Sequence, residues 1–402
     1  MKSITCVLVV AICATWMFVE SQGQDPQQGR ESLPGSRPVI QAADYPTIQS
    51  ALDAIPPEGG LVVLPPGRFE IASPLWIRTG DTCIEGSGTS TEIVNTNKGG
   101  EPAIIIDHPE ADADRSKNRL WRVRLTNFRV TGNEDSGPGI EARYVNEILI
   151  DAVSVSYSGG DGIRLDHCYE DPRIANCLLT YNKGIGVNLI GCHDIIVSAT
   201  QFEENQDALH CTDGFNLTMT GNTIDDHLGD GVVIENTYGS VVSGNMIEEC
   251  VGTAVIIDRD CYGIALSSNV IAHNGAGFDI RDGHGLSISA NTFTLMKTHA
   301  LIVRAASGRL AVTGNSFCNS YIGDGMIRRG TNDIEAGGIL LVGTSEITIS
   351  GNQISGLTTS AVELEGTVKR VIFSSNVLTD VNSGHGGLKD SLIGNNLDGV
   401  LQ

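Results

Sequence analysis

Hydrophobic and polar positions alternate along most of this chain in short stretches that repeat with a period of roughly two dozen residues. Each repeat holds an apolar-x-apolar stretch ending in Asn, as at 217–222, then a polar turn and a Gly- or Ala-led apolar-x-apolar stretch, as at 231–234. Alternation with period two, bounded by Gly, Asn and Asp, indicates short half-buried strands, and no amphipathic helix separates them. The pattern therefore predicts an all-β, single-domain parallel solenoid in which each repeat forms one turn.

The Asn that ends each repeat is predicted to have a structural role. If the repeats stack in register, these amides occupy one turn, and each can hydrogen-bond to the next and satisfy buried backbone groups. The expected ladder consists of Asn176, Asn222, Asn245, Asn269, Asn291, Asn315, Asn352 and Asn376.

A short amphipathic helix is expected at 45–55, with Thr47 as its N-cap and an apolar face that begins at Ile48. Strands are expected next at 59–69, 75–77 and 82–85. A solenoid needs a cap over the end of its apolar core, and this helix fits that need. We therefore assign residues 44–118 to the cap and first turns and residues 119–402 to the regular repeats. An insertion at 327–336 predicts a loop on one face, often the binding face of a repeat protein.

The N-terminal residues predict export. Residues 1–21 combine a lysine, an apolar run and small or β-branched residues before the end, which is typical of a cleaved signal peptide, although a retained anchor fits the same residues. Residues 22–43 are polar and suggest a disordered leader. The expected location is secreted or periplasmic, with no membrane segment after cleavage.

The net charge of −22 excludes nucleic acid and anionic membranes as natural partners. It favours a neutral polysaccharide or oligosaccharide, or a polyanion bridged by Ca²⁺. Eight cysteines remain after residue 21, without the spacing of a zinc site. Cys168 and Cys192 fall at one place in successive repeats, where a disulfide and simple packing of small apolar groups are both compatible.

The capping helix followed by GGLVVLPPGRF, the Asn-ended repeats and the Gly-apolar-x-apolar strands resemble the right-handed parallel β-helix, or pectate lyase-like, superfamily over about Asp44 to Asn396. The resemblance implies a right-handed β-helix and leaves lyases, glycosidases, epimerases, fructotransferases and adhesins open. The order of repeats from Ile195 to Leu357 is also similar to inulin fructotransferases, which implies a trimer; a monomer and a homotrimer both remain open.

Stacking the Gly- or Ala-led strands in register predicts three outward columns of side chains. The first column contains Asp161, Ile185, Asp207, Asp230, Thr253, Ala276 and His299; the second contains Arg164, Asn188, His210, Val233, Ile256, Asp279 and Ile302; the third contains Asp166, Ile190, Thr212, Glu235, Asp258, Arg281 and Arg304. Neighbours within a column should lie about 4.8 Å apart.

The columns predict a catalytic patch at Asp207, Asp230, His210 and Glu235. Two adjacent carboxylates raise one pKa, and glycoside cleavage needs such an acid beside a base or nucleophile. The same carboxylates could bind Ca²⁺; no other cofactor and no dedicated metal site is expected. The alternative is structural, because an Asp before Gly, as at 161 and 230, is a favoured turn residue.

A second patch is expected to bind substrate through Asp258, Asp279, Arg281, His299 and Arg304, since two stacked arginines could hold a carboxylate or phosphate. Salt bridges from these arginines to Asp258 and Asp279 are the alternative. Asn205-Gln206-Asp207 matches the first element of polygalacturonase-like members, but Gly229 replaces a required Asp and Arg-x-Lys is missing.

The sequence therefore predicts a secreted carbohydrate-active enzyme that cleaves glycosidic bonds of an extended polysaccharide. Hydrolase or fructotransferase chemistry is favoured over a lyase. The alternative is a non-catalytic extracellular carbohydrate-binding or surface-structural β-helix.

Overall fold

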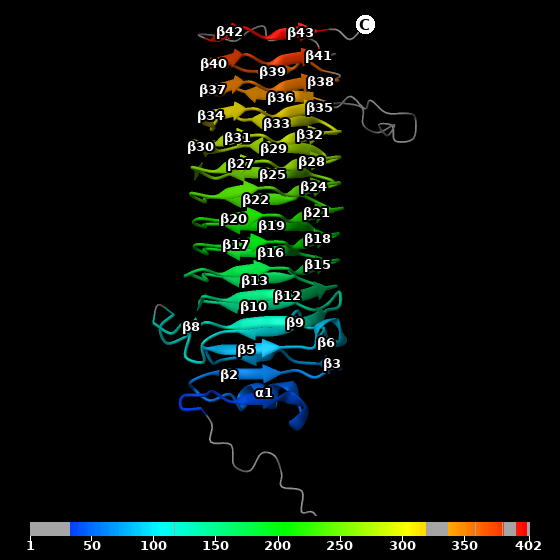
Figure 1. Ribbon diagram of the computed structural model, residues 1–402, viewed down its shortest axis with the longest axis vertical. Helices are drawn as coiled ribbons and strands as arrows, with labels where there is room; N and C mark the ends of the chain where they lie inside the picture. Colours follow the sequence, from blue (N-terminus) through cyan, green and yellow to red (C-terminus); the bar gives the residue numbers. More distant parts are fainter. Residues whose placement is uncertain are drawn as a thin grey trace, which may run out of the picture. The chain divides into compact units, whose positions relative to one another are not determined.

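The computed structural model describes residues 33–115, 117–318, 337–357, 359–379, 381 and 391–399. From Arg37 onward the chain is a single, nearly all-β parallel solenoid of about 14 turns, as predicted. Figure 1 shows its strands stacked turn upon turn, each hydrogen-bonded to the equivalent strand of the next turn. No helix in the described part of the chain is long and apolar enough to span a membrane.

One face of the solenoid is a sheet of 12 parallel strands. In chain order they are β4 (Leu75–Ile77), β7 (Ile104–Ile106), β10 (Ile140–Arg143), β13 (Ile163–Asp166), β16 (Ile185–Ile190), β19 (Asp207–Thr212), β22 (Val232–Glu235), β25 (Thr253–Asp258), β29 (Ala276–Ile280), β33 (His299–Val303), β36 (Gly337–Val342) and β39 (Val362–Glu365). All the predicted site residues lie on these strands or directly beside them.

The remaining faces form a sheet of 29 strands and a two-stranded pair, β8 (Leu120–Trp121) with β11 (Val145–Asn146). The strands of the larger sheet are β1 (Val39–Gln41), β2 (Gly60–Val63), β3 (Gly67–Ile71), β5 (Thr82–Glu85), β6 (Thr91–Asn95), β9 (Arg124–Thr131), β12 (Leu149–Ser156), β14 (Arg173–Ala175), β15 (Leu178–Thr180), β17 (Ile196–Ser198), β18 (Gln201–Glu203), β20 (Thr218–Thr220), β21 (Thr223–Asp225), β23 (Val241–Ser243), β24 (Met246–Glu248), β26 (Cys261–Tyr262), β27 (Ala265–Ser267), β28 (Val270–Ala272), β30 (Gly283–His284), β31 (Ser287–Ser289), β32 (Thr292–Thr294), β34 (Gly308–Thr313), β35 (Ser316–Cys318), β37 (Ser345–Ser350), β38 (Gln353–Ser355), β40 (Lys369–Ser374), β41 (Val377–Thr379), β42 (Leu392–Gly394) and β43 (Leu397–Gly399).

The first turn is capped as expected by the helix α1 (Ile48–Asp53). Thr47 accepts a hydrogen bond from the backbone N–H of Ser50, and the Ser50 hydroxyl faces the N–H of Thr47, which completes a capping box. Ala51 and Leu52 are buried on the face that covers the core. The expected leader ends before residue 43, because β1 pairs in parallel with β2 and belongs to the first turn.

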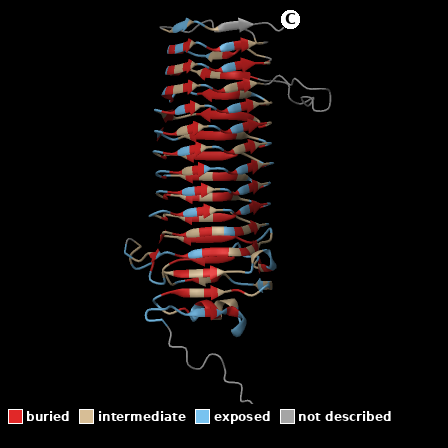
Figure 2. Cartoon of the chain, viewed as in Figure 1, coloured by how far each residue is buried: buried red, intermediate tan, exposed pale blue. Residues whose placement is uncertain are grey.

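The core lies between the sheets and is built from the inward residue of each strand, as the red segments in Figure 2 show. Val187, Leu209 and Val232 stack at one position in consecutive turns, for example. Cys168 and Cys192 are buried free thiols, which agrees with the packing alternative.

The Asn ladder is present, with one correction. Each amide from Asn222 onward donates to the next side chain at 2.9–3.1 Å, and the ladder continues to Asn396. Asn176 is not a member, since the backbone N–H of Cys177 donates to Thr200, whose own N–H donates to Asn222. Cys177 and Thr200 therefore occupy the ladder position in the earlier turns.

Aromatic and imidazole rings form a second ladder along a turn beside the sheets. It runs through Tyr144, His167, Tyr169, His193, Phe215, Tyr238, Tyr262 and His284, with neighbouring centroids 4.3–6.3 Å apart. Most of these rings face one another, so the faces that could stack on a sugar are largely covered by neighbouring rings.

Several expectations lie outside the described residues: the signal peptide at 1–21, the first half of the leader at 22–32, and the insertion at 327–336. They stay predictions.

Candidate functional site

The three predicted columns lie on the 12-stranded sheet in the expected register. His210 of β19 pairs with Asn188 on one side and Val233 on the other, and Asp279 of β29 pairs with Ile256 and Ile302. Glu235 pairs with Asp258 in the third column. The relative placement of these residues along the sheet is therefore as predicted.

In the paired strands β16 and β19 the outward positions are spaced by three residues and then by two. In β19, Ala208 and Leu209 are both buried between the outward residues Asp207 and His210, and Ala208 has no partner in the strand register. Gly186 of β16 likewise has no partner in the register, so both strands contain this buried residue and side chains three residues apart point to the same face. Asp207 and His210 meet for this reason.

Asp207 is half-buried and makes two contacts, one with each carboxylate oxygen. Its Oδ2 lies 3.0 Å from Nε2 of His210, and its Oδ1 accepts the backbone N–H of Asp230 at 2.5 Å. Burial opposes the charge, but the contacts with His210 and with the Asp230 N–H outweigh it, and the pKa of the Asp207 carboxyl is lowered. Asp207 is thus an ionised partner of His210.

The predicted acid pair between Asp207 and Asp230 is not formed at Asp207. Asp230 turns its own Oδ1 to the backbone N–H of Thr253 at 2.7 Å, and Asp161 does the same for Ile185 at 2.9 Å. Each aspartate therefore caps the first residue of the next turn. A raised pKa was expected at one of the two aspartates, and Asp207 is not that residue, because donors and not a second carboxylate surround its oxygens.

Glu235 is not brought into contact with the Asp207–His210 pair. Its carboxylate binds Arg259 at 3.1 Å, a residue that the columns did not indicate. Asp258 lies 3.8 Å from Arg281 and accepts the backbone N–H of Arg259. These two carboxylates form a separate, partly exposed group with two arginines.

The second predicted patch is assembled as an ion-pair network. The Asp279 carboxylate is 2% exposed and accepts from Arg281 at 2.9 Å and from Arg304 at 2.8 and 3.0 Å. The hydrogen bond to Asp279 raises the pKa of Arg304. The salt-bridge alternative therefore describes both arginines in this structure, and their role in substrate binding stays a prediction.

His299 has a partner that the sequence analysis missed. Its Nε2 lies 2.6 Å from Oε2 of Glu363, which belongs to β39, two strands away. Glu363 continues the second column beyond Ile302 and Leu340. The insertion at 327–336 interrupts the repeat in the sequence, so the pairing of Glu363 with this column could not be predicted.

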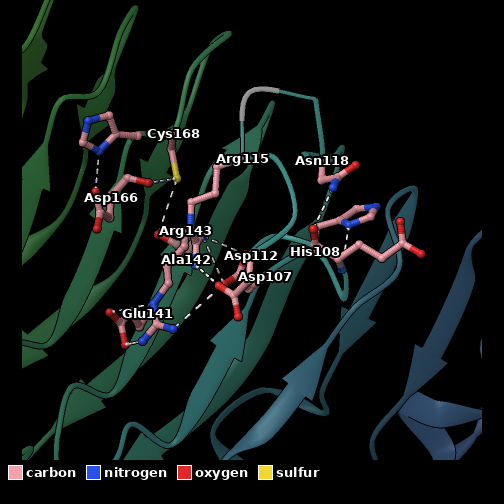
Figure 3. A network of polar contacts seen from close by, with 12 residues as sticks. Asp107, His108, Asp112, Arg115, Asn118, Glu141, Ala142, Arg143, Asp166 and Cys168 are labelled. Carbon is pink, nitrogen blue, oxygen red and sulfur yellow. Dashed lines mark hydrogen bonds and ion pairs between the residues drawn. The ribbon is translucent and has the colours of Figure 1, made fainter.

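A third polar cluster, also missed, lies near the N-terminal end of the same sheet (Figure 3). Asp107 and Glu141 are buried, and Arg143 donates to Glu141 at 3.1 and 2.7 Å. Arg115 reaches Asp107 at 3.4 Å from a loop that follows β7. Glu141 pairs with Arg164 in the second column, so extending that column by one turn would have indicated it.

Comparison with known proteins assigns this architecture to a family. The family model described as right handed beta helix region matches residues 111–227 and 162–317, together half of the chain. The chain belongs to the right-handed β-helix family. No curated protein matches it.

Solved structures share the β-helix fold at low identity. The A-module of mannuronan C-5 epimerase AlgE4 from Azotobacter vinelandii is 15% identical, with TM-score 0.61, covering 83% of this chain and 99% of that one. The tailspike of E. coli bacteriophage HK620, solved with a pentasaccharide, is 11% identical, with TM-score 0.62 and coverages of 86% and 73%. DFA-IIIase from Arthrobacter chlorophenolicus A6 without its lid is 13% identical, with TM-score 0.53 and coverages of 91% and 99%. The chain spans 62% of ORF18 of Geobacillus virus E2, another match.

The β-helix neighbours thus include a DFA-IIIase and a mannuronan C-5 epimerase, and the shared fold agrees with the right-handed β-helix that the sequence resembles. At these identities the likeness establishes the fold. The chemistry has to be argued from the residues of this chain.

On this β-helix a continuous polar strip runs across four neighbouring strands. It consists of Glu141, Arg164, Asn188 and His210, one residue per turn, and it ends at the apolar Val233. Arg164 Nε is buried without a hydrogen-bond partner among the described residues, 3.8 Å from Glu141. Asn188 donates to Asp161. The strip offers charged and neutral hydrogen-bonding groups along one line.

Carboxylates that could hold a metal ion lie elsewhere on the described surface. Asp260, Asp282 and His284 form one such group, and Asp225, Asp226 and Glu249 form another. Neither includes Asp207 or Asp230, and Ca²⁺ at the predicted pair stays a prediction.

Proposed function

We propose that this protein acts on a polysaccharide that lies along the outer face of the 12-stranded sheet, and that His210, oriented by Asp207, transfers a proton during cleavage of a glycosidic bond. The observation that carries the proposal is the 3.0 Å contact between His210 Nε2 and the Asp207 carboxylate. The epimerase, tailspike and DFA-IIIase that share the fold support a carbohydrate substrate.

The pair is suited to general-base chemistry. Because the pKa of Asp207 is lowered, its carboxylate is the acceptor and Nε2 of His210 carries the proton. This leaves Nδ1 with its lone pair to take a proton, and the resulting imidazolium is stabilised by Asp207. The proton would come from an attacking hydroxyl in a hydrolase or transferase, or from a carbon next to a carboxylate in a lyase.

The polar strip supplies the binding groups next to this base. Asn188 lies one turn from His210 and Arg164 one turn further, at a spacing of about 4.8 Å per turn. A sugar chain running along the stack of turns would meet one of these side chains after another. An extended polysaccharide therefore fits this face better than a compact small molecule.

The test is a screen of polysaccharides for new reducing ends and for absorbance at 235 nm, using wild type, His210→Gln and Asp207→Asn. We expect His210→Gln to lower kcat by about 10²-fold or more, the range for loss of a general base. His273→Gln is the matched control, since His273 also faces a carboxylate, Glu249, but lies outside the 12-stranded sheet. Absorbance at 235 nm would identify a lyase, and reducing ends without it a hydrolase or transferase.

His299→Gln separates this site from the competing pair of His299 and Glu363. Loss of activity in His299→Gln with full activity in His210→Gln would overturn the assignment. Equal activity in all variants would do the same.

A non-catalytic carbohydrate-binding β-helix is the second candidate. It is favoured by one observation: Asp161 and Asp230 cap the next turn as Asp207 does, yet neither contacts a histidine in the described structure. Binding of an oligosaccharide by wild type, measured by calorimetry, without any product in the screen would support it.

We also propose that the protein is exported, on the signal-like pattern of residues 1–21. N-terminal sequencing of protein recovered outside the cytoplasm should begin near residue 22; protein that keeps Met1 would contradict cleavage.

A further inference from the structure

A shallow cavity of about 450 Å³ lies beside the first turns and is unusually basic for this chain. Its lining includes Arg78, Arg119, Arg122, His108 and Trp121. Asp81 is the acidic residue in the lining. Three guanidinium groups and one carboxylate give a local positive charge on a protein whose net charge is −22.

The cavity is built by the short strand β8. Leu120 and Trp121 pair with Val145 and Asn146 of β11, and the backbone oxygen of Trp121 accepts the N–H of Asp81 at 2.7 Å. Gly80 permits this approach, because a Cβ there would lie 2.8 Å from the same oxygen. The Trp121 side chain remains 38% exposed at the rim.

Two of the three arginines have no carboxylate partner within the described residues. Arg122 is held by Asp81 at 2.7 and 3.1 Å. Arg119 instead donates to neutral oxygens, the Asn146 side chain and the His167 carbonyl, and lies over the Tyr169 ring at 4.3 Å. Arg78 lies over the Trp76 ring at 4.7 Å.

These contacts hold the two guanidinium groups in place and leave their charge uncompensated. Aromatic faces attract cations but do not neutralise them. Most other arginines of the described chain, such as Arg124, Arg129 and Arg304, face a carboxylate. The cavity is therefore a place where an external anion would gain two charge-assisted contacts.

His108 adds a hydrogen-bond donor. Its Nδ1 accepts the backbone N–H of Glu110 at 3.1 Å, so the proton of the neutral ring is on Nε2. An Asn118 hydrogen bond to the Glu110 carbonyl at 2.6 Å fixes the same loop (Figure 3). His108 therefore lies in a loop that is held by two hydrogen bonds.

We infer that this cavity binds an oxoanion carried on a saccharide, a carboxylate or a sulfate, with Arg78 and Arg119 supplying charge, His108 a hydrogen bond and Trp121 an aromatic surface for the sugar ring. Arginine matches carboxylate and sulfate oxygens with paired N–H groups, and an exposed indole packs on the apolar side of a sugar. The inference does not depend on proton transfer at His210, because it concerns binding alone.

The experiment is calorimetry on the full chain with four probes: hexagalacturonate, its fully methyl-esterified form, a sulfated heparin hexasaccharide and sodium sulfate. We expect at least one anionic hexasaccharide to bind about tenfold or more tightly than the neutral ester, and raising salt from 0.05 to about 0.5 M to weaken binding. The tighter of the two anionic sugars identifies carboxylate or sulfate as the ligand group.

Arg78→Gln should weaken that binding by about tenfold or more. Arg173→Gln is the matched control, because Arg173 is exposed on β14, like Arg78, and its guanidinium contacts a neutral group, the Asp171 carbonyl. Arg78 is itself exposed, so its replacement leaves the fold intact, which the melting curve will verify. Arg119→Lys should retain part of the affinity, since it keeps the charge but loses the planar fork.

Three results would overturn the inference: neither anionic hexasaccharide binding more tightly than the neutral ester, equal loss in Arg78→Gln and Arg173→Gln, or sodium sulfate binding as tightly as the hexasaccharides. An inactive His210→Gln variant that still binds the anionic sugar would leave it standing. Failure of this site and failure of the proposed reaction are therefore distinguishable.

Discussion

Asp207 Oδ2 lies 3.0 Å from His210 Nε2, three residues along one strand in which Ala208 and Leu209 are buried and both polar side chains point outward. The other carboxylate oxygen accepts the backbone N–H of Asp230 in the next turn. The Asp207 side chain thus has two roles, since it hydrogen-bonds the backbone of the next turn and orients the His210 imidazole.

Asp207→Asn tests the charge of this side chain. A group whose pKa is lower in the folded state stabilises the fold above its ordinary value, 3.8, and the contribution is lost as pH falls through the folded value. Wild type should therefore exceed Asp207→Asn in free energy of unfolding at pH 7, and the gap should close below about pH 3.8. Urea titrations from pH 7 to 2.5 measure it, with the exposed Asp135→Asn as control. A constant gap would show that the carboxylate is not preferentially ionised in the fold.

Gly229→Ala tests the position of the same carboxylate. A Cβ at residue 229 would lie 2.3 Å from Asp207 Oδ1, so the carboxylate or the backbone must shift. We expect the free energy of unfolding to fall by about 1–3 kcal/mol. The activity should fall by a larger fraction than the melting temperature, because the position of the carboxylate changes. Gly394→Ala is the control, because nothing lies within 4 Å of its added Cβ. Full activity in Gly229→Ala would separate the Asp207 geometry from function.

The same contact explains a departure seen in the sequence. Gly229 stands where polygalacturonase-like members have the first Asp of a pair. In this chain the carboxylate of Asp207 fills the space that a side chain at 229 would need. An Asp at 229 is therefore incompatible with the observed position of the Asp207 carboxylate.

The columns and the capping helix could be predicted from sequence because both rest on local periodicity. Period-two alternation and a recurrent Gly or Ala place His210 beside Asn188 without any knowledge of distant contacts. Side-chain direction could not be predicted in the same way. Adjacent positions for Asp207 and Asp230 left open whether two carboxylates meet or each caps a backbone N–H, and the second arrangement is found.

Contacts that cross an insertion or a long loop could not be predicted from the repeat pattern. Glu363 meets His299 across 64 residues of sequence, and Arg115 reaches Asp107 from an irregular segment. The prediction that Asn176 belongs to the ladder is wrong for the opposite reason. Asn176 fits the local sequence pattern, but it lies one position before Cys177, which occupies the ladder position. Only the register over several turns shows which residue occupies the ladder position.

Asn291→Ala tests the ladder. The Asn291 side chain donates to Leu266 O and Asn315 Oδ1 and accepts from Asn269, and all of these groups are buried. Removing it leaves several buried polar groups unpaired, at about 1–3 kcal/mol each. We expect a cooperative loss of stability of at least about 2 kcal/mol in chemical unfolding. Thr292→Ala, on the exposed neighbour, should change stability by less than about 0.5 kcal/mol. Equal effects in the two variants would argue that the ladder contributes nothing beyond local packing.

His227 makes the fold sensitive to mild acid. The ring is fully buried, its Nε2 has no partner among the described residues, and burial lowers its pKa to about 4. Because the folded pKa is below the ordinary 6.5, the unfolded chain binds the proton more readily between these values, and stability falls as pH drops from 6.5 to 4.

The loss across that window should reach about 3 kcal/mol in wild type. His227 lies in a turn position that Asn205 occupies one turn earlier and Asn274 two turns later. His227→Asn removes the titrating ring at a site that accepts asparagine, so its stability between pH 6.5 and 4 should be nearly flat. His273→Asn, on a partly exposed histidine, should keep the wild-type slope. Urea unfolding at half-unit pH steps compares the three proteins, and a wild-type slope in His227→Asn would assign the acid sensitivity to other groups.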